Sequence, residues 1–545
     1  MTHVLAVLLC LGALSQAATS TEETWEAARR NGARVNEIFL RTRRMLHAWL
    51  RHADRETLLL PDRLPGRIRG KVNTERVYRP HNSGADNYPY LILTAYLTDP
   101  AVYHGRMMEM LRNEVRYTCA PGTLLPAEFD FRTRRVGSPS FFGAGEYAKD
   151  GLLTVTELLG RTPWYFRMVD MMAEFCRRAP VPTRFGRLPD TGAELNGDVM
   201  QVLARLIPMT AEANFRDWAL AIGRAYVEEI LPANDGLPGY RWDFEKKADT
   251  GYTRLRDHGN EMIVGLVLAH AVLSDLGDVR AERWRPAIRK MLDRVLDSAN
   301  PDGMLYNEIH NRDLKPRDER LSDNWGYVYG AVYAFYQATG EEKYRAAARR
   351  VLGKLPKYRN YDWESGGMDG YADSIEGALY LVAREPVPEA LDWIESEMKV
   401  LLAYQQEDGT IERWYGDGNW NRTLLLYALM KTQGCYLKDW APGVELGAVR
   451  EGDRLYVTVH AAGEWSGRLV LDFARHRRVL QLARDYVRLN EWPQWYTVDE
   501  NTLYRVRDWS RKTDQLRLGS ELKEGLPLRL EAGETIRVLI QPARR

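Results

Sequence analysis

Apolar residues recur with a helical period from about residue 24 to residue 432, and the helices that this period predicts come in pairs. One member of each pair carries Arg, Glu and Lys on one face, as in residues 341–355 and 388–405, which is typical of a helix exposed to solvent on one side. The other member is apolar almost all round, as in residues 327–337 and 375–382. Such a helix must be covered on nearly all sides, so we interpret the two kinds as outer and inner helices.

The order of the two kinds of helix predicts a closed ring. The first outer helix, near residue 23, has no inner partner before it, and the last inner helix, near residues 419–430, has no outer partner after it. A pair of amphipathic helices cannot bury its apolar face alone, and pairs stacked in a circle leave no uncovered end. The predicted fold class is therefore mainly α, an (α/α) toroid of six or seven helical hairpins over residues 24–440.

The pattern changes after Trp440. Apolar and polar residues then alternate with a period of two, in segments such as 454–459 and 535–540, and breaks that contain glycine separate these segments. This alternation predicts a small C-terminal antiparallel β domain, sandwich-like, over residues 443–545, which we expect to pack against the toroid. The alternative is a carbohydrate-binding module that uses Trp492, Trp495 and Tyr496.

Three predicted outer helices are each followed by an Asp-Gly turn and then by an aromatic residue. The turns are Asp235-Gly236, Asp302-Gly303 and Asp408-Gly409, and the aromatic residues are Tyr240, Tyr306 and Trp414. Glycine accepts a positive φ without strain, so the dipeptide marks a tight turn. With this turn and its order of hairpins, the sequence resembles the six-hairpin glycosidase-like (α/α) toroid superfamily over about residues 24–440. The resemblance implies a carbohydrate-active enzyme in which such turns lead toward the catalytic cleft.

Composition narrows the class of partner. Lys and Arg number 76 against 75 Asp and Glu, so the chain has no excess of basic charge for binding nucleic acid. The 16 Trp and 29 Tyr far outnumber the 12 Phe, which favours aromatic rings with a polar group, suited to stacking on sugars at a wet cleft. We therefore expect an oligo- or polysaccharide as the partner, and no nucleic acid.

The first residues predict export. Residues 4–14 are apolar over the length of a signal-peptide core, and residues 15–17, Ser-Gln-Ala, offer small side chains at the two positions that a signal peptidase reads. We expect a signal peptide over residues 1–17 and a periplasmic or extracellular location. No later apolar run is long enough to span a bilayer. No spacing typical of a disulfide framework or a zinc site relates the remaining cysteines, Cys119, Cys176 and Cys435.

The inner helices of a toroid run the same way, so their N-termini open on one face, and polar residues cluster there in this sequence. One N-cap explains one Asp or Asn at each helix start, but not several polar residues that continue into apolar helices. The candidate substrate-binding residues are His81, Asp86, Asn87, Glu194, Asn196, Asp198, Arg256, Asn260, Asp323, Asn324, Trp325, Tyr371, Arg413 and Trp414. Helix starts at Asp86, Asp198, His258, Asp323 and Asp373 are predicted to line a single cleft.

Two clusters place pairs of carboxylates on one helical face, because Asp257 and Glu261, and likewise Asp369 and Asp373, are four residues apart. Glycoside hydrolysis uses two carboxyl groups, and a second carboxylate one turn away can raise the pKa of its neighbour so that it donates a proton. The predicted acid and base are therefore Glu261 and Asp373, in an order that the sequence leaves open. Asp257, Asp369 and His258 complete the candidate catalytic set.

Converging helix N-termini, each with about half a positive charge, favour an anionic ligand, and basic residues such as Arg254 and Arg256 lie near them. The carboxylate of a uronic acid would be attracted by this positive potential, so the predicted function is hydrolysis of a uronate-containing glycan. One alternative is a polysaccharide lyase, in which His258 or Tyr371 removes a proton beside the uronate carboxylate, and another is a glycan-binding protein without activity. No motif of a zinc protease, esterase, nucleotide hydrolase or dinucleotide-dependent enzyme is present, and neither a cofactor nor a metal is implied.

Overall fold

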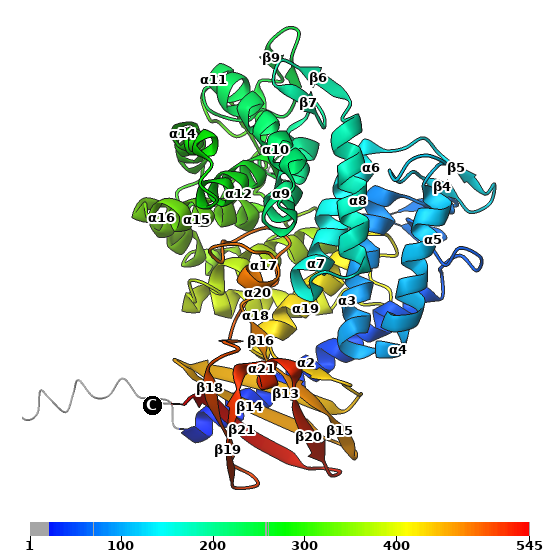
Figure 1. Ribbon diagram of the computed structural model, residues 1–545, viewed down its shortest axis with the longest axis vertical. Coiled ribbons are helices and arrows are strands. Elements are labelled where there is room, and N and C mark those ends of the chain that lie inside the picture. The colour runs from blue at the N-terminus through cyan, green and yellow to red at the C-terminus, as the bar shows by residue number, and fades with distance from the viewer. Residues whose placement is uncertain (1–20, 69, 257–258, 260, 544–545) are drawn as a thin grey trace, which may run out of the picture. The chain divides into compact units, whose positions relative to one another are not determined.

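The computed structural model describes residues 21–68, 70–256, 259 and 261–543 (Figure 1). These residues form two compact units that alternate along the sequence. One, the β unit, holds the chain up to Leu40, Tyr427–Phe473 and the chain from Gln494 onward, and the other, the helical unit, holds Arg41–Leu426 and Ala474–Pro493. The domain ranges expected from the sequence, 24–440 and 443–545, stay predictions.

The inner helices are apolar on nearly all sides and almost entirely buried. Within the described residues they occupy seven positions: α3 (Tyr88–Thr98), α6 (Phe141–Glu146) with η3 (Tyr147–Leu152) and α7 (Leu153–Leu159), α9 (Ala193–Thr210), α12 (Glu261–Asp275), α15 (Trp325–Thr339), α17 (Met368–Val382) and α19 (Asp417–Lys431). Two π-helical turns interrupt this regular pattern, η3 within the second position and η1 (Pro80–Asn87) directly before α3.

The outer helices alternate with the inner ones and have one polar face. They are α2 (Thr21–Leu50), α4 (Pro100–Val102) with η2 (Tyr103–Met107) and α5 (Met108–Thr118), α8 (Pro163–Arg178), α10 (Ala213–Ala225) with η4 (Tyr226–Ile230) and α11 (Leu231–Ala233), α13 (Val279–Glu282) with α14 (Arg285–Asp297), α16 (Glu342–Leu352) and α18 (Pro388–Leu402). In α8, α14 and α18 a proline stands in the first turn, where its missing N–H costs no helical hydrogen bond.

The ring closes between the ends of the helical sequence. Trp49, near the end of α2, donates a hydrogen bond from Nε1 to Oδ2 of Asp417 at the start of α19, at 3.0 Å. The last inner helix also meets the first, since Asn421 on α19 donates from Nδ2 to Oγ1 of Thr94 on α3, at 2.9 Å. The predicted mainly α fold, an (α/α) toroid, is confirmed, and the described chain forms seven hairpins.

Glycines allow neighbouring inner helices to approach closely. A Cβ on Gly326 of α15 would lie 2.5 Å from Cα of Gly377 on α17. A Cβ on Gly197 of α9 would collide with the backbone of Glu261, the first residue of α12. The packing around Gly197 therefore fixes the start of α12, where a predicted catalytic carboxylate lies.

Antiparallel strands form the β unit, as the period-two alternation predicted. A five-stranded sheet has the order β13 (Val444–Glu451), β14 (Arg454–Ala461), β21 (Thr535–Pro542), β18 (Leu503–Asp508) and β19 (Thr513–Leu518), and a three-stranded sheet has the order β12 (Tyr436–Lys438), β15 (Trp465–Val470) and β20 (Leu526–Leu530). The N-terminal part of α2 packs on the larger sheet, where the ring of Trp25 lies 5.0 Å from that of Tyr456. One parallel pair joins β16 (Asp472–Phe473) to β17 (Thr497–Val498).

The remaining elements are short. Strand pairs and a three-stranded group lie in the loops: β1 (Gly66–Ile68), β2 (Lys71–Asn73), β3 (Val77–Tyr78), β4 (Phe129–Asp130), β5 (Arg135–Val136), β6 (Val181–Thr183), β7 (Gly186–Leu188), β8 (Trp242–Asp243), β9 (Ala248–Asp249), β10 (Tyr252–Arg254) and β11 (Glu308–His310). The short helices are η5 (Leu355–Tyr358), α20 (Arg475–Arg478) and α21 (Gly519–Glu524). Among the described helices, none combines the length and the apolar character that a membrane crossing requires.

Candidate active site

A cavity of about 110 Å³ lies in the helical unit, at the N-terminal ends of the inner helices. Its lining consists of Asp86, Glu146, Lys149, Asp150, Glu194, Glu261, Asn324, Tyr327, Asp369, Asp373, Tyr415, Asn419, Arg422 and Leu489. Glu194, Glu261, Asp369 and Asn419 all stand in the first turn of their helices. Inner helices that run the same way thus bring residues distant in sequence into one place.

Residues predicted from the sequence supply part of this lining: Asp86, Glu194, Glu261, Asn324, Asp369 and Asp373. Of the helix starts that were predicted to share one cleft, Asp86 and Asp373 line the cavity, whereas Asp198 and Asp323 do not. Three predicted residues lie outside the described part of the chain and stay predictions: Asp257, His258 and Asn260.

Two predicted residues support the helices that carry the cavity instead of lining it. Asn196 donates from Nδ2 to the backbone oxygen of Gly192 at 2.7 Å, which ties the loop before α9 to that helix. Trp325 donates from Nε1 to Oγ of Ser374 at 2.7 Å and is fully buried between α15 and α17. Polar atoms at helix starts satisfy the backbone as often as they meet a ligand, and the sequence pattern alone does not separate these roles.

Other predicted residues also lie outside the lining. Arg413 contacts Asp408 at 2.9 Å, and Arg256 contacts Glu364 at 3.9 Å. Trp414 donates from Nε1 to Glu412 at 2.8 Å, and the ring of Tyr371 lies against that of Tyr404. Asp323 accepts at Oδ1 from the backbone N–H of Asn324 at 3.0 Å. His81 lies against the ring of Phe142, where burial lowers the pKa of the imidazole, and Asn87 is fully buried. Arg256 and Arg413 thus each lie beside an acidic side chain.

Sequence analysis missed charged residues in the middle of the inner helices. Lys149 and Asp150 lie in η3, and Arg422 lies in the second turn of α19. π-Helical turns are rare and often mark functional sites. The signal that could have found all three residues is charge inside an otherwise apolar helix, because a buried Lys or Arg is costly unless it is paired.

The Lys149 ammonium group is surrounded by carboxyl groups. Its Nζ lies 3.1 Å from Oδ2 of Asp150, 3.6 Å from Oδ1 of Asp198 and 3.7 Å from Oε1 of Glu261. Burial alone would lower the pKa of a lysine, but these carboxylates raise the pKa of Lys149 well above its usual value. Glu146 completes the cluster, and burial together with the charge of Asp198 raises the pKa of Glu146 well above its usual range. One ammonium cannot neutralise four carboxylates, so the cluster retains protons.

Two carboxyl groups of the lining have pKa values that are moved in opposite directions. Burial raises the pKa of Asp86 well above its usual value, and the negative charge of Asp150 adds to this shift. Burial would raise the pKa of Asp150 as well, but the Lys149 ammonium and a hydrogen bond from Asn490 hold it below its usual value. The cavity thus contains one carboxyl suited to donate a proton and one suited to accept it.

Arg422 forms a second charged centre of the lining. Its Nη2 lies 2.7 Å from Oδ1 of Asp373 and 2.5 Å from Oε2 of Glu376. Asn324 donates from Nδ2 to Oδ2 of Asp373 at 2.9 Å, so both oxygens of Asp373 are engaged. Burial raises the pKa of Glu376 to about 7, against the opposing charge of Arg422.

No protein-family model matches the sequence, and no curated protein matches it. Among solved structures, the chain is similar to a family 76 glycoside hydrolase, a mannosidase, from Bacteroides thetaiotaomicron, with 14% identity over 72% of this chain and 99% of that one and a TM-score of 0.41. It is also similar to a cellobiose 2-epimerase from Bacillus thermoamylovorans, with 11% identity over 61% of this chain and 90% of that one and a TM-score of 0.41. An unsaturated glucuronyl hydrolase from a Bacillus species shows 14% identity over 52% of this chain and 85% of that one, with a TM-score of 0.36.

The helical order and the closure of the ring show the toroid architecture in this chain. Identities of 11–14% and TM-scores near 0.4 say nothing about its chemistry.

Proposed function

We propose that the protein is a glycoside hydrolase in which Asp86 is the general acid and Asp150 the carboxylate that acts as base or nucleophile. The observation that carries this proposal is the opposite displacement of their pKa values in one cavity. Glycoside hydrolysis requires a protonated and an ionised carboxyl group at the same pH, and differences in surroundings are how two carboxyls take these two roles. Asp86 is partly exposed at the cavity, whereas Glu146, the other carboxyl with a strongly raised pKa, is buried against Asp198.

The alternative of a lyase needs a base at the site that can remove a carbon-bound proton. His258, one base expected from the sequence, lies outside the described residues, and Tyr371, the other, does not line the cavity. Tyr327 and Tyr415 line the cavity, but burial raises the pKa of both phenols above the usual value near 10. A phenolate is therefore costly to form there. A protein that only binds glycans would have no need for several buried carboxyl groups, which are expensive to desolvate. Hydrolysis uses a pair of such groups, which supports the proposal.

The charge of the side chains that line the cavity restricts the charge of the sugar that can bind there. Among the described residues, seven carboxyl groups and two basic groups line the cavity: Asp86, Glu146, Asp150, Glu194, Glu261, Asp369 and Asp373 against Lys149 and Arg422. Even with Asp86 and Glu146 protonated, the other five carboxyl groups outnumber the two basic groups, which already lie within 4 Å of carboxylates. An added uronate carboxylate would therefore meet net repulsion. We therefore propose a neutral or basic sugar at this position, and the uronate expected from the sequence becomes the competing outcome of the test.

The test is incubation of the protein with three matched sets of oligosaccharides, neutral, amino-sugar and uronate-containing, followed by mass spectrometry and ultraviolet absorbance of the products. Hydrolysis adds one water to each cleaved bond, whereas elimination adds none and gives an unsaturated, absorbing product. Cleavage of neutral or amino-sugar chains with gain of water supports the proposal. Cleavage only of uronate chains would restore the sequence-based substrate, and an unsaturated product would replace the hydrolase by the lyase.

A further inference from the structure

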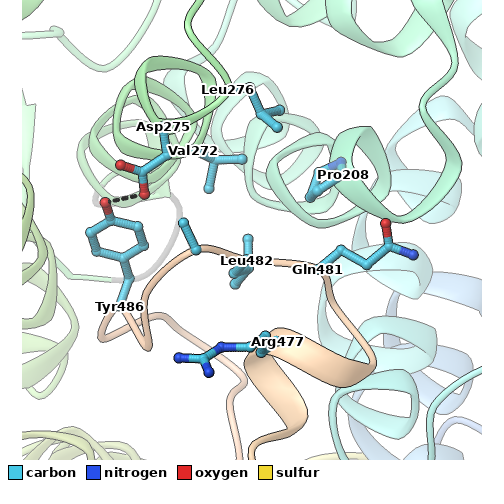
Figure 2. A pocket seen from close by; sticks show the side chains of 9 residues that line it. Pro208, Val272, Asp275, Leu276, Arg477, Gln481, Leu482 and Tyr486 are labelled. Carbon is cyan, nitrogen blue, oxygen red and sulfur yellow. Dashed lines mark hydrogen bonds between the residues drawn. The ribbon is translucent and has the colours of Figure 1, made fainter.

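The segment Ala474–Pro493 leaves the β unit after β16 and returns to it at β17, yet it belongs to the helical unit. Figure 2 shows part of its attachment: Tyr486 donates from its hydroxyl to Oδ2 of Asp275, on α12, at 2.6 Å. At the end of the segment, Trp492 donates from Nε1 to the backbone oxygen of Thr154, on α7, at 2.9 Å. The segment therefore spans from the C-terminal end of α12 to the inner helix that carries Asp150.

A buried ion network fixes the middle of this segment. Arg488 contacts Glu157 on α7 at 2.8 Å and Glu491 at 3.3 Å, and Arg205 on α9 contacts the same Glu157 at 3.1 Å. The side chains of these four residues are completely buried. Arg205 also donates to the backbone oxygen of Leu489 at 2.6 Å. Ion pairs of this kind gain little net stability after desolvation, but they place the backbone around Leu489 with precision.

The network brings Leu489 to the cavity and the next residue, Asn490, to the carboxylate of Asp150. Leu489 is part of the lining. Asn490 has a φ of 64°, a left-handed conformation that Asn, Asp and Gly tolerate best. Its buried amide donates from Nδ2 to Oδ1 of Asp150 at 2.8 Å and to the backbone oxygen of Lys149 at 3.1 Å.

We propose that Asn490 is a positioning residue of the active site, which orients the carboxylate of Asp150 and keeps it ionised by donating a hydrogen bond to the oxygen that Lys149 does not contact. The segment that contains Asn490 would then be part of the catalytic machinery, although it lies more than 300 positions from Asp150 in the chain. The role of Asp150 rests on the proposed function, whereas the effect of Asn490 on its ionisation does not.

Other charged or titratable groups also act on Asp150, and an experiment must separate Asn490 from them. They are Lys149 on the same turn, Glu146 on α6, Asp86 on η1, Asp198 on α9, Arg422 on α19 and the Tyr90 hydroxyl on α3, which donates to the backbone oxygen of Asp150 at 3.2 Å. None of them is altered by a substitution at position 490.

Substitutions at Asn490 can respect its backbone conformation. Asn490→Gly removes the side chain with its amide, and Asn490→Asp replaces the donor by a carboxyl, while both accept the positive φ. Gln481→Gly is the matched control, because Gln481 belongs to the same segment, has a φ of 57° and lines a different cavity, of about 320 Å³, shown in Figure 2.

The first measurement needs no substrate. In Asn490→Asp, the introduced carboxyl faces Asp150 in a buried site, so its pKa in the folded state lies above that in the unfolded state. Below this raised pKa the carboxyl is protonated and can donate to Asp150 as the amide does. We expect the Tm of Asn490→Asp, relative to that of the wild type, to fall as the pH rises from 5 to 8. The differences for Asn490→Gly and Gln481→Gly should stay constant over this range.

The second measurement uses the glycan that the substrate panel identifies. Loss of one hydrogen bond to a carboxylate should raise the pKa of Asp150 by about one unit, so the acid limb of the kcat/KM profile of Asn490→Gly should move up by about one pH unit. The profile of Gln481→Gly should match that of the wild type. An unshifted limb together with a pH-independent Tm difference for Asn490→Asp would overturn the inference. If no glycan is cleaved, the proposed function fails and the Tm measurement still decides the role of Asn490.

Discussion

The surroundings of each carboxyl decide what it can do in this cavity. Asp86 and Asp150 are chemically identical, and they lie on two π-helical turns that contact each other. Burial and a negative neighbour favour the protonated form of Asp86, whereas Lys149 and Asn490 favour the ionised form of Asp150. The proposed acid and the proposed base are therefore two copies of one side chain.

Asp86→Asn and Asp150→Asn should each lower kcat by about 10²–10⁴-fold, because a positioned acid or base contributes that much to the rate. The amide keeps the size of the carboxyl, so the folded state should persist, as circular dichroism would show. Glu261→Gln and Asp373→Asn, the pair predicted from the sequence, are the comparison. Loss of this size in the comparison pair alone would return the acid and base roles to Glu261 and Asp373.

The stability of the protein should depend on the protonation of Asp198. Burial raises the pKa of Asp198 to about 7, above its value in the unfolded chain, so the folded state binds more protons than the unfolded state between about pH 4 and pH 7. Stability from this group is therefore lost as the pH rises through 7. Asp198→Asn cannot ionise, and relative to the wild type it should gain about 1 kcal/mol or more between pH 5 and pH 8 in urea unfolding. Asp170→Asn, at an exposed position on α8, should show no such gain.

At the scale of elements, composition distinguished the two kinds of helix because burial on all sides and burial on one face require different residues. Residues 375–382, predicted as inner, lie in the buried helix α17, and residues 341–355, predicted as outer, include α16. The π-helical turn η3 was not predicted, because its hydrogen-bond pattern depends on packing. Lys149 and Asp150 were missed with it, since the polar clusters that predicted the site stand at the starts of other inner helices.

The contact between α9 and α12 at Gly197 should tolerate no side chain. Gly197→Ala places a Cβ against the backbone of Glu261, which cannot rotate away, so overpacking should cost about 1–3 kcal/mol of unfolding free energy. Denaturant unfolding measures this cost. Gly353→Ala is the control at the end of α16, where φ is −69° and a Cβ meets only ordinary contacts, and there the substitution should be neutral or stabilising.

In the whole molecule, the helical unit is completed by a segment that interrupts the β unit in sequence, between β16 and β17. Arg488 and Glu157 lie 331 positions apart in the chain and are both fully buried. No local pattern predicts such a pairing, which is why the sequence predicted the ring but neither Leu489 in the cavity lining nor the hydrogen bond from Asn490 to Asp150. The tertiary contact alone reveals the segment as part of the site.

Arg488→Ala should destabilise the helical unit by about 3–5 kcal/mol, because Glu157 and Glu491 would lose a buried partner. Unfolding in guanidinium chloride measures the loss. Arg484→Ala removes an arginine from the same segment at a half-exposed position and should cost less than about 1 kcal/mol. Equal costs for the two variants would show that the buried network does not anchor the segment.

The separation of Glu157 and Arg488 along the sequence, 331 positions, also affects the order in which the helical unit is completed during synthesis. Arg488 is made only after the inner helices, and at roughly 5–20 residues per second the ribosome needs several seconds more to pass from Leu426 to Arg488. During this interval the nascent ring has Glu157 and Arg205 in place without their third partner. A chain stalled on the ribosome before Arg488 should therefore remain sensitive to protease, and one released after Pro493 should become resistant, which limited proteolysis of stalled chains would show. The helical unit is thus begun early in translation and finished almost at its end.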